Sequence, residues 1–154
     1  MPSLIPRSIS RSPWQPGPEA PTPDQVLVSL TEFTARRHSQ ILPIALSGLR
    51  LRRSWPRTPG AVGMWLWTDP WRKRSGSVSV WTDERSLYAF VGRPDHVRIV
   101  RAHRDRGEMR ATAWALDRFD PGDVWAAAHS LITGPDPIGS TPLPPRAVHA
   151  TESE

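Results

Sequence analysis

Two histidines are the side chains in this sequence best suited to acid–base or ligand chemistry. His96 and His103 are seven residues apart, so a helix would present both on one face with Val100 between them. A neutral imidazole in that position can bind a metal or haem, or remove a proton from an acidic phenol or enol. The alternative interpretation is a pair of partly exposed helix residues. No carboxylate has the spacing that would complete a metal site with them, so we expect no metal.

Tryptophans form the second candidate set. Trp65, Trp67, Trp81 and Trp114 fall on three predicted strands, and strand alternation directs Trp65 and Trp67 to the same face. Such indoles can sandwich a planar ligand and offer their N–H groups as donors. The alternative is that they fill the core or a dimer interface.

Composition excludes several classes of function. The chain has no cysteine, which excludes disulfides, thiolate zinc sites and a nucleophilic thiol. There is also no P-loop, no Rossmann glycine set and no nucleophile elbow. No secretory signal or apolar run of about 20 residues is present, so we expect a cytoplasmic protein that does not enter a membrane.

The positive charge is a weak signal. The formal net charge is +5, and all of the 20 basic residues except Lys73 are arginines, a bias that GC-rich coding can also produce. Basic residues gather around Arg72 to Arg74 and from Arg50 to Arg57. Because solvated surface is the ordinary place for such residues, we expect no nucleic-acid partner.

The two ends of the chain are rich in proline. Residues 1–24 and 134–154 contain too few apolar side chains to offset the entropy of ordering them, so we predict disordered tails. Residues 25–133 then form a single domain.

Within that domain the hydrophobic period alternates between strand and helix. The pattern predicts strands at 26–33, 61–67, 77–81 and 109–116. It predicts a helix from Ser39 to about Trp55, and a second helical stretch from about residue 83 that Gly92 interrupts and Gly107 ends. A short C-terminal helix over 121–132, capped by Asp120, is expected to pack over an edge of the sheet.

This order of elements predicts an α+β fold. Right-handed crossovers place both main helices on one face of a four-stranded antiparallel sheet, which is the ferredoxin-like β-α-β-β-α-β arrangement. The other sheet face would be bare and would carry tryptophan. Because such a patch exceeds what monomers usually expose, we expect a homodimer.

A family resemblance rests on particular segments. Pro59-Gly60-Ala61-Val62-Gly63, then Asp69-Pro70 with a basic turn, then the run Ser79 to Phe90 (SVWTDERSLYAF) and Pro94-Asp95-His96 resemble antibiotic-biosynthesis-monooxygenase-like proteins. These proteins belong to the dimeric α/β-barrel superfamily. The resemblance spans about residues 26 to 116 and implies a fold more than a chemistry, because the family contains cofactor-independent oxygenases, haem-degrading enzymes and members of no known activity.

The resemblance can be tested residue by residue. Haem degraders of the superfamily have a Trp on the second helix and an axial His ten residues later, and aligning on Trp81 places Phe90 and Val100 at these positions. His96 and His103 flank the axial position, so haem could bind only in a shifted mode, which the resemblance itself does not imply. The polar Asn, Trp and Tyr set of the cofactor-independent oxygenases is incomplete, because the chain contains no asparagine.

These observations favour a cofactor-independent, monooxygenase-like oxidoreductase acting on a small hydrophobic or aromatic, polyketide-like substrate. His96 would be the catalytic base. The predicted ligand-binding residues are Trp65, Trp67, Trp81, Phe90, Val100 and His103. A non-enzymatic ligand-binding or dimer-forming protein of the same fold, and a haem-binding protein, remain open alternatives.

Overall fold

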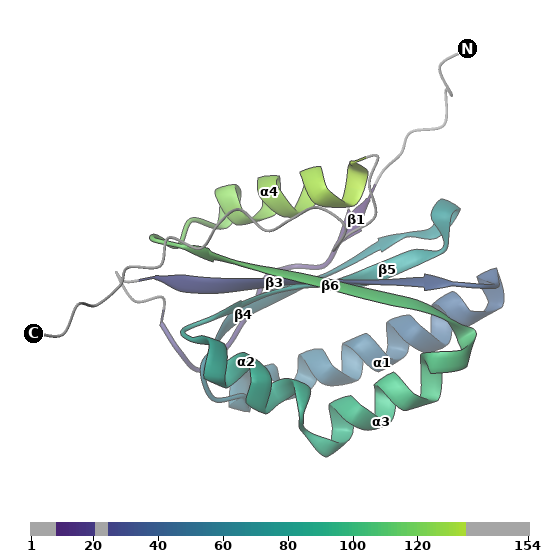
Figure 1. Ribbon diagram of the computed structural model, residues 1–154, viewed down its shortest axis with the longest axis horizontal. Coiled ribbons are helices and arrows are strands. Elements are labelled where there is room, and N and C mark those ends of the chain that lie inside the picture. The colour runs from purple at the N-terminus through teal and green to yellow at the C-terminus, as the bar shows by residue number, and fades with distance from the viewer. Residues whose placement is uncertain (1–8, 21–24, 135–154) are drawn as a thin grey trace, which may run out of the picture.

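The computed structural model describes residues 9–20 and 25–134 (Figure 1). Its main strands are β3 (Val26–Ala35), β4 (Ala61–Asp69), β5 (Arg74–Trp81) and β6 (Gly107–Leu116), and its α-helices are α1 (Ile41–Ser54), α2 (Glu84–Val91), α3 (Pro94–His103) and α4 (Pro121–Thr133). Two short strands, β1 (Ser10–Arg11) and β2 (Gln15–Pro16), precede them. No helix in the described part of the chain is long and apolar enough to cross a membrane.

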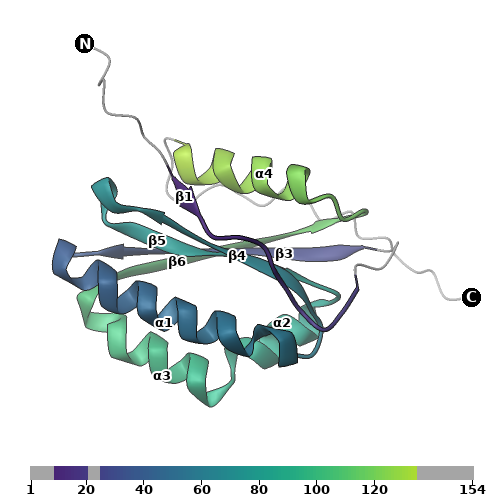
Figure 2. The same cartoon turned by 180° about the vertical axis from the view of Figure 1, so that it is seen from behind.

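The strands form one antiparallel sheet in the order β1-β4-β5-β3-β6, with β2 also paired to β4. Helices α1, α2 and α3 cover one face of this sheet, and α4 lies across the other face (Figures 1 and 2). The predicted α+β, ferredoxin-like fold with an extra C-terminal helix is confirmed. The sheet has more strands than the four expected, because β1 and β2 extend it at the β4 edge.

The N-terminal segment differs from its prediction. Residues 9–20 were expected to belong to a disordered tail, but Ser10 pairs with Thr68 and Gln15 pairs with Met64 along β4. The Trp14 ring lies 4.4 Å from that of Trp65, over a glycine of β4. Edge hydrogen bonds and the packing of this one partly buried indole outweigh the ordering cost that composition suggested. The rest of the predicted tails, residues 1–8, 21–24 and 135–154, lies outside the described residues.

Helix α4 also differs from its expected position. It packs on the sheet face rather than over an edge, and its Val124, Ala128 and Ile132 are fully buried. These residues recur every four positions, so they form one stripe along the helix. They meet Trp65, Trp67 and the valines of β3 and β5 in the larger of two hydrophobic clusters. The sheet face that the sequence predicted to be bare, and to be buried by a second protomer, is therefore covered by α4 of the same chain.

The two faces of the sheet have different chemistry. Towards α4, the central strands present Val28, Leu30, Val78 and Val80, which are fully buried. Towards α1 and α3, the same strands present serine and threonine at alternate positions. The apolar cluster on this side is smaller and gathers around Trp55 and Trp81.

Candidate functional site

A row of hydroxyl groups lines the sheet face beneath α1 and α3. Ser29 lies opposite Ser79, and Thr31 lies opposite Ser77, in the pairing of β3 with β5. The two hydroxyls of the second pair are 2.7 Å apart. Residues that alternate along a strand share a face, so the row continues over both pairs. We call Ser29, Thr31, Ser77 and Ser79 the hydroxyl row.

Strand β6 extends this face without being covered by a helix. By the pairing of β3 with β6, Ala111 lies beside Thr31 and Ala113 beside Ser29. Ala111 is exposed, as are Met109 and Ala115 on the same side of β6. The face therefore opens to solvent along β6 next to the hydroxyl row.

His103 projects from α3 into this layer. Its side chain is buried, with 6% of the residue exposed, and Nε2 is 3.2 Å from the Ser47 Oγ of α1. Ser47 donates its own proton to the Pro43 carbonyl at 3.1 Å. Because a hydroxyl has one proton, Ser47 accepts from the histidine, and Nε2 must carry a hydrogen. The lone pair of a neutral His103 is therefore on Nδ1, which is buried and has no hydrogen-bond partner within the described residues.

The charge state of His103 follows from its surroundings. Burial lowers the pKa of its imidazole below the ordinary value of 6.5, and the guanidinium of Arg106 lowers this pKa further. The ring of Phe33 stands edge-on at 6.2 Å. His103 is thus a neutral base at pH 7, with an unused nitrogen facing the protein interior.

His96 occupies the opposite end of α3 and is held differently. Its Nδ1 donates to the Val91 carbonyl at 3.1 Å, and its ring packs against Phe90 at 5.0 Å. Burial is the main cause that lowers the pKa of His96, while the Val91 hydrogen bond and the Asp95 carboxylate oppose it. The imidazole is only partly buried. One helix therefore holds two bases, about 10 Å apart along its axis.

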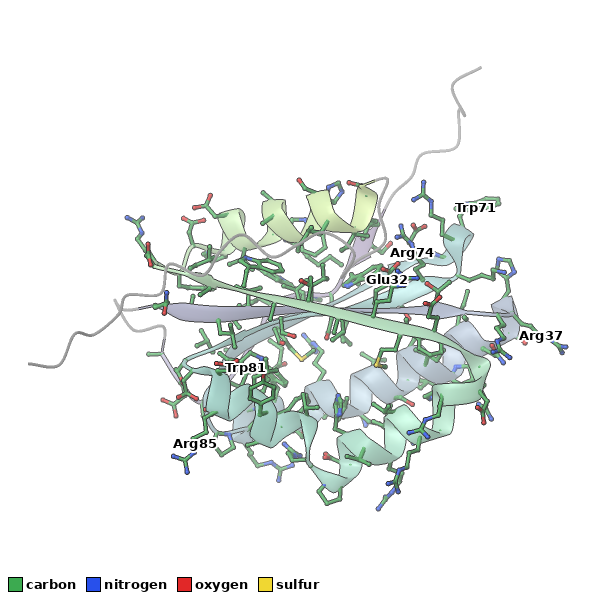
Figure 3. All side chains as sticks on the ribbon, in the orientation of Figure 1. Glu32, Arg37, Trp71, Arg74, Trp81 and Arg85 are labelled. Carbon is green, nitrogen blue, oxygen red and sulfur yellow. The ribbon has the colours of Figure 1, made fainter. Side chains whose placement is uncertain are left out.

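Aromatic side chains gather at the His96 end. The Trp81 ring lies 5.0 Å from Trp55 and 5.3 Å from Phe90, and its Nε1 donates to the Ser79 hydroxyl at 2.9 Å. Trp81 lies at the end of the sheet near α2 (Figure 3). The site thus has an aromatic end at Trp81 and a polar end at His103, joined by the hydroxyl row.

The structure brings together only part of the predicted set. Trp81, Phe90, Val100, His96 and His103 belong to the helix side of the sheet, with Val100 partly buried on α3 between the histidines. Trp65 and Trp67 point to the α4 side and are buried in the other cluster. They share one face, as alternation predicted, but the sheet separates them from the other five residues.

Sequence reasoning missed Ser47 and the hydroxyl row. The signal for the row is visible in Ser75-Gly76-Ser77-Val78-Ser79, where small polar residues take every second position of a strand. One face of such a strand is apolar and the other is hydroxyl-bearing. Ser47 has no comparable signal, because its partner His103 is 56 residues away.

The site lacks a ligand set for a metal ion and the axial donor that the resemblance would place for haem, whereas a shifted haem mode on the free Nε2 of His96 stays an alternative. Within residues 9–20 and 25–134, no three His, Asp or Glu side chains gather closely enough to hold a metal ion. Val100 takes the position of the axial ligand implied by the resemblance, and its side chain has no donor atom. His103 already uses Nε2 towards Ser47.

Comparison with solved structures identifies the fold. The cofactor-independent oxygenase SnoaB from Streptomyces nogalater matches 64% of this chain and 98% of its own, with a TM-score of 0.52 and 18% identity. A Nitrosomonas europaea protein, provisionally assigned as an antibiotic biosynthesis monooxygenase, has a TM-score of 0.54 and 8% identity over 64% of this chain and 94% of its own. The chain has the fold of the antibiotic-biosynthesis-monooxygenase-like proteins. At these identities the likeness concerns the fold alone.

A further solved structure is longer than this chain, and two sequence comparisons found no match. A Lactobacillus acidophilus protein, provisionally assigned as a monooxygenase, matches over 64% of this chain but only 47% of its own, with a TM-score of 0.51 and 12% identity. This chain therefore spans about half of that protein. No protein-family model matches the sequence, and no curated protein does.

Proposed function

We propose that the protein binds a small aromatic molecule over the hydroxyl row and oxidises it with dioxygen in the manner of the cofactor-independent oxygenases. The observation that carries the proposal is the buried, unpartnered Nδ1 of His103 on the polar side of the sheet. A buried nitrogen without a partner is costly, and a ligand hydroxyl or acidic C–H group would supply one.

The parts of the site suit the two ends of such a ligand. Trp81 and Phe90 offer ring surfaces at one end, and aromatic stacking suits a flat apolar ring. Ser77 and Thr31 can exchange their mutual hydrogen bond for bonds to ring substituents. The exposed strip of β6 is the natural route of entry, because no helix covers it.

The reaction begins with proton transfer to Nδ1 of His103. A substrate with an acidic CH₂ group next to aromatic rings becomes a carbanion, which reduces dioxygen and combines with it to form a hydroperoxide. Loss of water from the hydroperoxide leaves a ketone. The CH₂ carbon thus loses both hydrogens and gains one oxygen atom, while the second oxygen atom leaves as water. Exclusion of water around the buried imidazole favours the first step.

His103 replaces His96 in the role of base for a geometric reason. Both histidines keep one nitrogen free of the hydrogen bonds described, but His103 is the more buried residue, and it packs against Phe33, which follows Thr31 of the hydroxyl row on the same face of β3. His96 lies at the aromatic end and is partly open to solvent. We therefore assign proton removal to His103 and ring positioning to the end that contains His96.

Oxygen consumption tests the proposal with 1,8-dihydroxyanthrone as the probe. We expect one dioxygen consumed per anthrone and an anthraquinone product, at a rate above the spontaneous background. His103→Gln should lower that rate by about 10²-fold or more, as expected for loss of a general base. His96→Gln should change it less. Thermal unfolding of each variant separates loss of the base from loss of the fold.

Two outcomes would redirect the proposal. Binding of the probe without turnover, seen as quenching of tryptophan fluorescence, would favour the non-enzymatic ligand-binding alternative. Neither binding nor turnover, for this probe and a set of related phenols, would count against a ligand site beside His103.

A further inference from the structure

Three loops meet at the end of the sheet farthest from α2. The β3–α1 loop is tied to the β4–β5 hairpin by a hydrogen bond from the Ala35 N–H to the Lys73 carbonyl at 2.8 Å. It is tied to the α3–β6 connection by a bond from the Arg36 N–H to the Arg106 carbonyl at 2.9 Å. Backbone pairing therefore fixes the three loops side by side, at the right of Figure 1.

Each of these loops contributes basic side chains. We call this group the cationic end, and its members are Arg36, Arg37, Arg72, Lys73, Arg104 and Arg106. The four outermost arginines, at 36, 37, 104 and 106, are exposed and make no ion pair within the described residues. Of the nearby acids, Glu108 is paired with Arg110 at 2.8 Å, and Asp69 is 4.0 Å from Arg72 and 3.0 Å from Arg74, which leaves Asp105 as the acid of these loops with no ion pair among the described residues.

Two large apolar side chains project beside these charges. Trp71, at the hairpin tip, is 71% exposed, and Leu42, in the first turn of α1, is 67% exposed. The hairpin turn is closed by a hydrogen bond from the Lys73 N–H to the Pro70 carbonyl at 3.1 Å, and the Lys73 ammonium donates to the Arg36 carbonyl at 3.3 Å. Lys73 adopts a left-handed conformation to close the turn. Trp71 is thus exposed on a turn that is bonded to the β3–α1 loop.

We propose that the cationic end docks on the surface of an anionic lipid bilayer. Four to eight basic residues grouped on one surface suit the negative potential of such a membrane. Tryptophan favours the headgroup region, and an exposed leucine can enter the acyl boundary beside it. Trp71 on the hairpin and Leu42 just after the β3–α1 loop would add apolar contacts to those of the arginines.

A single-stranded nucleic acid would use fewer of the exposed side chains at the cationic end than a lipid surface would. Such a partner would pair its phosphates with the arginines and stack one base on Trp71, but stacking platforms normally use several aromatic rings along a groove. Leu42 has no role in that contact. The combination of one interfacial indole, one exposed leucine and unpaired arginines favours the lipid surface.

Co-sedimentation of the full-length protein with vesicles tests this proposal. We expect binding to phosphatidylcholine vesicles that contain phosphatidylglycerol, and little binding to phosphatidylcholine alone. Each unit of charge near such a surface changes the affinity about fivefold. Arg37→Glu removes one positive charge and adds one negative charge, so it should weaken binding by roughly 30-fold. Trp71→Ala and Leu42→Ser should each weaken it severalfold. All three positions are exposed, so folding should be retained, and a thermal melt checks this.

Matched controls lie at the opposite end of the molecule. Arg85→Glu makes the same change of charge, and Figure 3 places Arg85 at the end away from Trp71 and Arg37. Tyr88→Ala removes an aromatic ring that is 63% exposed on α2. Both should bind vesicles nearly as the unchanged protein does.

Three results would overturn the proposal. The first is equal loss of binding in Arg85→Glu and Arg37→Glu, which would indicate net charge alone. The second is no preference for the anionic vesicles. The third is binding to an oligo(dT) strand that is tighter than vesicle binding and depends on Trp71, which would favour the nucleic acid.

Discussion

At the scale of single residues, one helix holds its two histidines in unlike states. The His103 proton is assigned to Nε2 by a serine whose own proton is committed elsewhere. The His96 proton is assigned to Nδ1 by a backbone carbonyl. In each ring the nitrogen that remains is the acceptor, so the two lone pairs belong to different ring positions. The shared face of His96 and His103 is predictable from spacing, whereas these tautomers depend on partners that a sequence pattern does not identify.

The lowered pKa of His103 predicts a loss of stability in acid. In the unfolded chain the imidazole titrates near its ordinary value of 6.5, and in the folded protein its pKa lies lower. Between these two values the unfolded state binds more protons, so the free energy of unfolding falls as the pH drops below about 6.5. It levels off below the folded pKa. Urea unfolding between pH 5 and pH 8 measures this slope.

His103→Gln should reduce the dependence of the free energy of unfolding on pH, because the imidazole that takes up a proton on unfolding is gone. His96→Gln should reduce it too, since burial also lowers the pKa of His96. The exposed His129 of α4 provides the matched control for loss of an imidazole. An unchanged slope in the His103→Gln and His96→Gln double variant would contradict the lowered pKa of these two histidines in the folded protein.

At the scale of elements, α4 is fixed to the sheet by charge as well as by apolar packing. Arg74 of β5 is 2.9 Å from the Glu32 carboxylate of β3 and 3.0 Å from the Asp69 carboxylate of β4. The same guanidinium donates to the Ile132 carbonyl in the last turn of α4 at 3.0 Å. A cation at a helix C-terminus is favourable for the helix dipole. One side chain therefore links three strands and a helix.

Replacing Arg74 should be strongly destabilising. The side chains of Arg74, Glu32 and Asp69 are 14%, 6% and 9% exposed, so Arg74→Met would leave the Glu32 carboxylate without its cation and Asp69 with only the 4.0 Å contact to Arg72. We expect a loss of about 3–5 kcal/mol in the free energy of unfolding, measured by denaturant titration. Arg110→Met, which breaks the exposed pair with Glu108, is the control and should cost less than about 1 kcal/mol. Equal costs would show that the Arg74 network contributes no more than a surface pair.

Most elements were predictable because their signals are local. The hydrophobic period and the cap expected at Asp120 identify helices that the structure contains, and the Asp120 carboxylate accepts a hydrogen bond from the backbone N–H of Asp123. The positions of α4 and of the N-terminal strands were not predictable in this way. They depend on which distant surface offers an apolar face or a free strand edge, and composition alone made the segment around Trp14 resemble a tail.

At the scale of the whole molecule, the sheet divides a packing side from a candidate binding side. The α4 side contains the larger apolar cluster, including Trp65 and Trp67. The opposite side contains the hydroxyl row and both histidines of α3. Apolar residues concentrated on one face leave the other free to carry polar groups. The homodimer expected from the sequence stays a prediction, but an uncovered tryptophan face is no longer a reason for it.

Removing α4 should convert that covered face into an association surface. A chain that ends at Phe119 would expose the partners of Val124, Ala128 and Ile132, all of which are fully buried in the intact protein. Contiguous apolar patches of several hundred Å² promote self-association. We expect light scattering to give a larger mass for this truncated chain than for the intact protein at equal concentration. Far-UV circular dichroism should show that the sheet persists.

Ala128→Asp tests the same point with less change to the chain, since it places a carboxylate in the contact between α4 and the sheet. It should shift the mass in the same direction and increase binding of an apolar dye. An exposed change on the same helix, Ala126→Asp, should do neither. If both the truncated chain and Ala128→Asp keep the mass of the intact protein, the face that α4 covers does not drive association.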